Sequence, residues 1–85
     1  MKRDEIIVKI KEIIGEAIEN GQNLQENEDL IESRGLRSID AIRIMVMVED
    51  AFNIEVEDQD LTIELIRTID NLTDYIEKKV GMEHV

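Results

Sequence analysis

The sequence predicts an all-α fold. Proline is absent from the 85 residues, and the only aromatic residues are Phe52 and Tyr75. Helices exclude proline from their interiors, whereas β-sheets are enriched in aromatic and β-branched residues. Apolar residues recur at helical spacing in several stretches of the chain. The length and the 42% hydrophobic content predict a single domain, residues 1–85, with a thin core.

The first predicted helix covers residues 4–20. Asn20-Gly21 supplies a stop signal at its end. Its apolar positions follow the helical repeat: Ile6, Ile10, Ile13, Ile14, Ala17 and Ile18. Residues 21–37 show no sustained periodicity, which predicts a long loop. Connections of this length in small domains usually have a function or are disordered.

The second predicted helix covers residues 38–53. Ser38 is expected to cap its first turn through the hydroxyl, and Asp40 complements the positive end of the helix dipole. A helical projection places one apolar stripe toward the core: Ala41, Ile44, Met45, Val48, Ala51 and Phe52. This stripe predicts that the helix packs against the rest of the domain.

A second apolar strip, formed by Ile39, Ile42 and Val46, falls on the other side of the same helix. Charged residues border it. Two interpretations remain open from geometry alone. Either the helix is central and buried on both sides, or the strip is an exposed surface that binds a partner.

The remaining residues predict a short third helix and a longer fourth one. The acidic segment 54–67 predicts a loop followed by a short helix at about 59–66. The fourth helix is expected over 68–80, with Thr68 as its cap and Gly81 as its stop.

Composition excludes several classes of function. A net charge of -11 would repel nucleic acid and anionic lipid surfaces, so neither is expected as a partner. Cysteine is absent, which rules out disulfides, thiolate metal sites and a cysteine nucleophile. The N-terminus turns acidic before any apolar stretch of signal-peptide length, so a cytoplasmic location is expected.

No catalytic or metal-binding constellation is evident. The single histidine, His84, lies in the C-terminal tail and is expected to be solvated. Neither Ser33 nor Ser38 has a base nearby in sequence that could activate its hydroxyl. The acids of segment 54–67 lack the spacing of a calcium-binding loop. The residues therefore predict a helical protein that is not an enzyme and has no metal site.

The segment Gly35-Leu36-Arg37-Ser38-Ile39-Asp40 resembles the phosphopantetheine-attachment signature of acyl carrier proteins, commonly Gly-x-Asp-Ser-Leu. The order of features around it resembles the same family, because an acidic helix end with a phenylalanine and a short loop follow at 49–56. The stretch 68–76 resembles the start of the last helix of the family. The resemblance covers about residues 4–80 and implies a four-helix bundle with a short third helix and a long loop between helices 1 and 2.

The resemblance also implies a function. A phosphopantetheinyl transferase would use coenzyme A and magnesium to attach 4'-phosphopantetheine covalently to Ser38 through a phosphodiester. The thiol of the arm would then hold acyl or aminoacyl intermediates as thioesters. Further partners would be an acyl-loading ligase or transferase and synthase enzymes of fatty acid, polyketide, lipid or nonribosomal peptide-type biosynthesis, and the carrier is expected to be a monomer.

Corresponding positions of the second helix dock partner enzymes in the family, which favours the partner-binding interpretation of the strip. The expected docking residues are Arg37, Ile39, Asp40, Ile42, Arg43, Val46, Glu49 and Asp50. The expected lining of a cavity for an acyl chain, besides its role as bundle core, is Ile44, Met45, Val48, Val56, Leu61 and Ile66.

The sequence departs from the family pattern in its positive charges. Arg37 replaces the usual aspartate before the serine, and Arg34 and Arg43 add charge to a surface that is typically acidic. Like-charge repulsion should weaken docking to generic partners, which present basic residues. We therefore expect a specialised carrier with a dedicated partner rather than the housekeeping fatty-acid carrier. The alternative is a non-modified helical adaptor that binds partners through the second helix.

Overall fold

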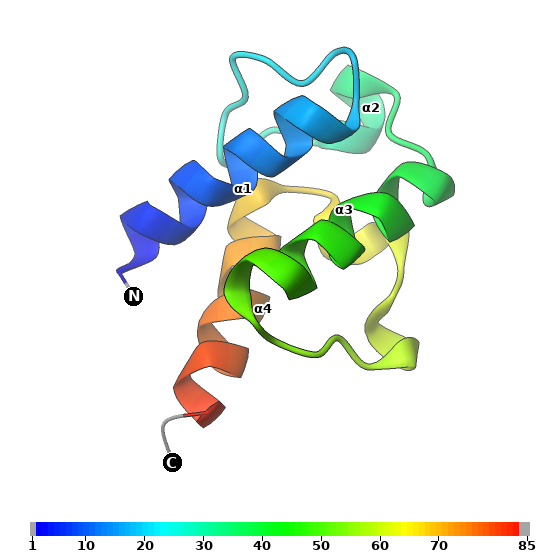
Figure 1. Cartoon of the computed structure of the whole chain (residues 1–85). Helices are drawn as coiled ribbons and strands as arrows, with labels where there is room; N and C mark the ends of the chain where they lie inside the picture. Colours follow the sequence, from blue (N-terminus) through cyan, green and yellow to red (C-terminus); the bar gives the residue numbers. More distant parts are fainter. Residues whose placement is uncertain (1, 84–85) are drawn as a thin grey trace.

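All regular structure in the described part of the chain is helical. The computed structural model describes residues 2–83, and side chains only for residues 2–81; His84 lies outside the described residues. The elements are α1 (Arg3–Ala17), α2 (Leu30–Arg34), α3 (Ser38–Phe52), the 3-10 helices η1 (Asp58–Asp60) and η2 (Ile63–Ile66), and α4 (Ile69–Glu83). The predicted all-α class is therefore confirmed (Figure 1).

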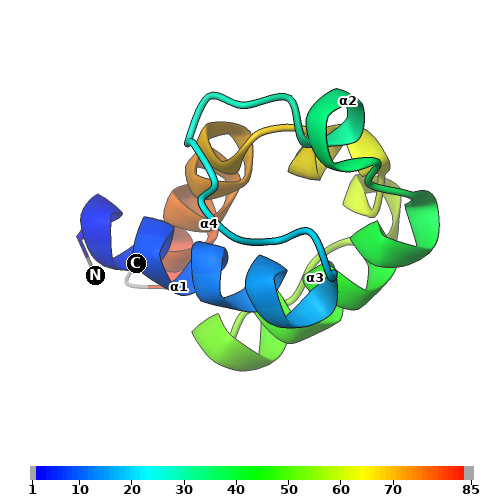
Figure 2. The same ribbon diagram turned by 90° about the horizontal axis from the view of Figure 1, so that it is seen from above.

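Three long helices surround one core. α1 lies against both α3 and α4, and η2 fills the space between α3 and α4. Figure 2 shows α1 and α3 side by side, while the connection from α1 to α2 runs over one end of the bundle. The fully buried side chains are mostly aliphatic: Ile6, Ile10, Ile14, Leu30, Ile44, Met45, Val48, Ile66, Ile69, Leu72 and Ile76. Burial of this apolar surface is the main force that holds the helices together.

α1 ends at Ala17, three residues before the predicted end at position 20. The backbone of Ile18 is already extended, and its side chain is only half-buried. The chain then turns back so that Gly21 lies directly on α1. A Cβ at Gly21 would stand 2.7 Å from the carbonyl oxygen of Ile14 and 2.8 Å from the Cα of Gly15. This close backbone contact requires the chain to leave the helix early.

The segment predicted as a long loop contains the short helix α2. Asp29 caps it, because its carboxylate accepts hydrogen bonds from the backbone N–H groups of Ile31 and Glu32, each at 3.1 Å. Gly35 ends it in the left-handed conformation, with φ 65°. Both capping signals are present in the sequence, but a helix of five residues is too short to show a periodic pattern.

The connection before α2 is fastened to the start of α4. The N–H of Leu30 donates to the carbonyl of Arg67 at 2.7 Å, and the N–H of Asp70 donates to the carbonyl of Glu26 at 2.9 Å. The guanidinium of Arg67 also donates to the carboxylate of Asp29 at 2.7 Å. These bonds fix the path of the chain that leads to α3.

The C-terminal half differs from the prediction in two places. The predicted helix at 59–66 is formed by two separate 3-10 turns, η1 and η2, rather than one helix. α4 continues through Gly81, which was predicted to stop it. Gly81 is exposed, and a Cβ there would meet nothing within 4 Å, so the helix tolerates this glycine without having to end. Thr68 caps α4 as expected, because its hydroxyl accepts from the N–H of Asn71 at 3.0 Å.

The carboxylate of Glu28, in the connection between α1 and α2, should make the free energy of unfolding depend on pH in the acid range. Glu28 accepts hydrogen bonds from the Arg34 guanidinium, the Ser33 hydroxyl and the N–H of Gln25, which lowers its pKa to about 2. Because the folded pKa lies below the ordinary value of 4.5, these bonds stabilise the fold above about pH 4.5. The stabilisation is lost as the pH falls from about 4.5 to about 2.

We therefore expect the urea midpoint of the wild-type chain to fall between pH 6 and pH 2 more steeply than that of Glu28→Gln. Asp29 and Asp40 also have lowered pKa values, so the variant retains part of the decline. Parallel curves for the two proteins would show that Glu28 does not contribute.

Candidate functional site

Ser38 is the first residue of α3. The residue two positions before it, Leu36, is buried at 4% exposure and anchors the incoming chain. Arg37, Ser38 and Ile39 are all exposed. Among the described residues no hydrogen bond engages the Ser38 hydroxyl, so the oxygen is available for modification.

The start of α3 is capped differently from the prediction. Arg37 occupies the N-cap position, and Ser38 does not cap the helix. The carboxylate of Asp40 instead accepts from the N–H of Arg37 at 2.9 Å and from its guanidinium Nε at 3.3 Å. Burial alone would raise the pKa of Asp40, but the bonds from Arg37 and the nearby charge of Arg43 lower it. Asp40 is only 5% exposed, so the structure does not support it as an exposed docking contact.

The second apolar strip of α3 is exposed. Ile39, Ile42 and Val46 have exposed fractions of 58%, 55% and 56%. This excludes the interpretation that α3 is buried on both sides. Apolar side chains that stand together in solvent favour a binding surface.

The charged residues that border the strip have different local roles. Asp50 is exposed, whereas Glu49 is half-buried and accepts from the N–H of Val56 at 2.9 Å. Arg43 donates from Nη1 to the carbonyl of Ala17 at 3.0 Å, which satisfies a carbonyl at the end of α1. Glu49 and Arg43 therefore also hold their own chain in place.

The expected cavity residues lie in the core, with one exception. Ile44, Met45, Val48 and Ile66 are fully buried, and Val56 is 5% exposed. Leu61 is 38% exposed, so the structure does not support it as part of an enclosed lining. Leu61 directly follows the 3-10 helix η1.

Two side chains of α4 bind the segment around η1, and the sequence analysis did not identify them. The Tyr75 hydroxyl donates to Asp60 at 2.9 Å, and the Lys79 ammonium lies 3.5 Å from Glu57 and 5.6 Å from the centre of the Tyr75 ring. Burial and the bond to Asp60 raise the pKa of Tyr75. The sequence did contain a signal for this pair, because Tyr75 and Lys79 are four residues apart and therefore lie on the same face of one helix.

Two other kinds of feature, a metal-binding cluster and a membrane-spanning helix, are absent from the described residues. No group of three or more histidine, aspartate or glutamate side chains is arranged to hold a metal ion in that part of the chain. None of the described helices combines the length and the apolar character that crossing a membrane requires.

Comparison with known proteins decides the family. The family model described as "Phosphopantetheine attachment site" matches residues 8–76. The chain belongs to the acyl carrier protein family. An acyl carrier protein of Thermotoga maritima is 36% identical over 80 residues, which cover 93% of this chain and 96% of the relative. One of Phytoplasma mali is 32% identical over 76 residues, 88% of each chain.

A solved structure supports the same assignment. The crystal structure of an acyl carrier protein from Thermotoga maritima matches with a TM-score of 0.77 and 29% identity, and the match covers 96% of this chain and 94% of the other. The helical bundle implied by the resemblance is thereby confirmed. Acyl carrier proteins bear 4'-phosphopantetheine and are carriers rather than catalysts, and they interact with synthases and transferases. The cofactor expected from the sequence is therefore that of the family.

Proposed function

We propose that Ser38 is the residue that receives 4'-phosphopantetheine and that the arm carries acyl or aminoacyl groups as thioesters. The exposure of Ser38 and its uncommitted hydroxyl at the beginning of α3 support this proposal. A helix N-terminus also favours the negative charge that the phosphodiester would bring. The matched family region, residues 8–76, includes Ser38.

Chemically, the transfer replaces one bond to phosphorus with another. The Ser38 oxygen would attack the phosphorus of coenzyme A that bears the pantetheine group, and the nucleotide portion would leave as 3',5'-ADP. The serine proton would be removed by a base on the transferase, because no base contacts Ser38 among the described residues. The chain would thus supply an accessible nucleophile but no catalytic group.

The exposed strip of Ile39, Ile42 and Val46 is the proposed docking surface for the transferase, for the acyl-loading ligase or transferase and for the synthases. Arg37, Arg43, Glu49 and Asp50 surround it. An apolar centre within a charged border is the usual arrangement of a protein interface. The proposed cargo space lies among the core residues Ile44, Met45, Val48, Val56 and Ile66, where an acyl chain would be shielded from water.

Arginines near Ser38 favour a specialised carrier over a housekeeping one. Arg37 is exposed at the attachment site in a chain whose net charge is -11. Partners that present basic residues would be repelled there. We infer a dedicated partner in a biosynthetic pathway of the fatty acid, polyketide, lipid or nonribosomal peptide type, a monomeric carrier and a cytoplasmic location.

Intact mass tests the attachment site. We expect incubation with coenzyme A, magnesium and a broad-specificity transferase to add one phosphopantetheine group to the wild-type chain and none to Ser38→Ala. Ser33→Ala is the matched control, because it removes the other serine, whose hydroxyl is bound to Glu28, and it should be modified like wild type.

The opposite result identifies the alternative function. If no transferase modifies the wild-type chain and protein from its native cell carries no arm, the chain acts as a non-modified adaptor that binds partners through α3. Modification that persists in Ser38→Ala would assign the arm to another residue.

A further inference from the structure

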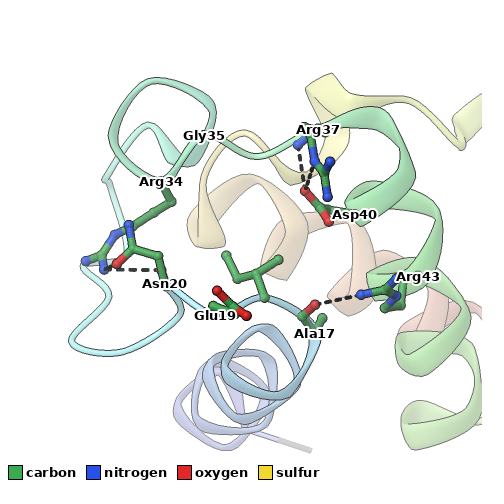
Figure 3. A pocket seen from close by; sticks show the side chains of 9 residues that line it. Ala17, Glu19, Asn20, Arg34, Gly35, Arg37, Asp40 and Arg43 are labelled. Carbon is green, nitrogen blue, oxygen red and sulfur yellow. Dashed lines mark hydrogen bonds and ion pairs between the residues drawn. The ribbon is translucent and has the colours of Figure 1, made fainter.

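A polar pocket lies beside α3, next to the attachment site. Its volume is about 480 Å³. Its lining comes from the end of α1, the end of α2 and the first turns of α3: Ala17, Ile18, Glu19, Asn20, Arg34, Gly35, Arg37, Asp40 and Arg43. Figure 3 shows Arg34, Arg37 and Arg43 placed around this pocket from different sides. Three of the five arginines of the chain thus line one pocket, although the net charge of the chain is -11.

Arg34 is fully engaged in holding the chain before α2. Its Nε donates to Glu28 at 2.7 Å, and its Nη atoms donate to the carbonyls of Gln22 at 2.8 Å and Asn23 at 3.1 Å. Its side chain is only 16% exposed. Arg34 therefore shapes the pocket but has little capacity to bind a ligand.

Arg37 and Arg43 have donors to spare. Arg37 uses Nε for Asp40 and leaves both Nη groups without an acceptor among the described residues, on a side chain that is 74% exposed. Arg43 uses Nη1 for the carbonyl of Ala17, and within the same part of the chain its Nε and Nη2 have no acceptor. Each guanidinium is thus held in position by one bond and keeps two nitrogens free for another group.

Two acids, Glu19 and Asp40, also line the pocket, but they leave the remaining N–H groups of Arg37 and Arg43 without a hydrogen bond in the described part of the chain. Asp40 already binds Arg37 as the cap of α3, and among the ion pairs of the described residues Glu19 has none with either arginine. Guanidinium groups with parallel free N–H bonds favour planar, bidentate acceptors, of which a carboxylate is the commonest in proteins. The pocket thus has the chemistry of a carboxylate site.

The position of the pocket indicates where that carboxylate comes from. Arg43 is four residues after Ile39 and three before Val46, so it borders the exposed strip on the helix surface. A protein that covers the strip would reach the pocket with the same face. An extended polyanion or a lipid surface would instead meet the repulsion of the whole chain.

We propose that this pocket binds an aspartate or glutamate side chain of the enzyme that docks on α3, with Arg37 and Arg43 as the recognising groups. The proposal rests on the proposed function, since the docking enzyme is a partner of the carrier. It adds a specificity rule: the dedicated partner presents a carboxylate beside an apolar patch, where a generic partner presents basic residues.

Two short peptides test the pocket on the unmodified chain. The first is amide-capped Lys-Leu-Glu-Leu-Lys, in which leucines flank one carboxylate, and the second has Gln in place of Glu. We expect NMR titration to show the Glu peptide binding about three- to tenfold more tightly, with shifts at the pocket residues and at the side-chain Nε of Arg43. The advantage should shrink as sodium chloride is added.

Variants locate the effect. In Arg37→Gln/Arg43→Gln the advantage of the Glu peptide should disappear, and in the matched control Lys78→Gln, which removes an exposed positive charge on α4, it should remain. Equal affinities of the two peptides for the wild-type chain would overturn the proposal without any variant. An advantage that survives the double substitution would overturn it as well.

The experiment is independent of the attachment chemistry. Ser38→Ala should bind the Glu peptide like the wild-type chain. A missing mass increase on Ser38 would therefore reject the carrier function while leaving the carboxylate site measurable. A normal mass increase with no preference for the Glu peptide would reject only the pocket.

Discussion

Val46→Asp should slow the modification of Ser38 by about tenfold or more, the equivalent of at least about 1.4 kcal/mol in transition-state binding. Val46 is 56% exposed in the strip of Ile39, Ile42 and Val46, so the substitution costs the isolated fold little. In the complex with a transferase, the new carboxylate would be buried against apolar surface without a partner. The loss should persist at high salt, because it arises from desolvation more than from long-range charge.

The matched control is Val8→Asp. Val8 is 57% exposed, but it lies on α1 outside the strip. Both variants add the same charge to an equally exposed valine, so only the location differs. Modification rates measured at low and high salt, together with the melting temperatures of the three proteins, check the prediction. If Val46→Asp reacts as fast as Val8→Asp, the strip has no part in docking the transferase.

The sequence was sufficient to predict the two faces of α3, because a helix of 15 residues repeats its pattern several times. It could not decide whether the strip of Ile39, Ile42 and Val46 was buried. That depends on whether another element covers it, and in the structure α1 and η2 pack on other sides of the helix. The periodicity of apolar residues thus predicts which faces of a helix are apolar, and only the tertiary structure shows whether another element covers each face.

Capping was harder to predict than periodicity. Ser38 and Asp40 both have side chains that cap helices, and they lie two residues apart. The structure uses Asp40, whose carboxylate reaches back to the N–H of Arg37 from the third helical position. This choice leaves the Ser38 hydroxyl without a structural bond in the described part of the chain. The incorrect prediction, that Ser38 caps the helix, therefore concerns the residue proposed to receive the phosphopantetheine arm.

The arginine pocket could not be found from the sequence because its walls are far apart along the chain. Arg43 is separated from Ala17 by 26 positions, and their hydrogen bond forms only when α3 packs on α1. The sequence showed three arginines in excess of the family pattern. It could not show that Arg34 is internally satisfied while Arg37 and Arg43 keep free donors.

The path of the chain after α1 depends on a glycine, and its substitution should have the largest effect on stability. Gly21 is buried against the backbone of α1, where an added Cβ would stand 2.7 Å from the carbonyl oxygen of Ile14 and 2.8 Å from the Cα of Gly15. Neither neighbour is a flexible side chain that could rotate away. Gly21→Ala therefore forces the chain off the helix, and overpacking of this kind costs about 1–3 kcal/mol.

In a domain of this size that cost corresponds to a fall in melting temperature of about 5–20 °C. Gly81→Ala is the matched control, because a Cβ at Gly81 meets nothing within 4 Å and the residue lies inside α4. Alanine exceeds glycine in helix propensity by about 1 kcal/mol, so this variant should melt at the same or a higher temperature. Thermal unfolding followed by circular dichroism compares both variants with wild type. Equal stability of Gly21→Ala and wild type would contradict the prediction, because the turn after α1 could then open without cost. The contact of Gly21 with α1 would in that case not hold the pocket wall formed by Ala17, Ile18 and Asn20 in place.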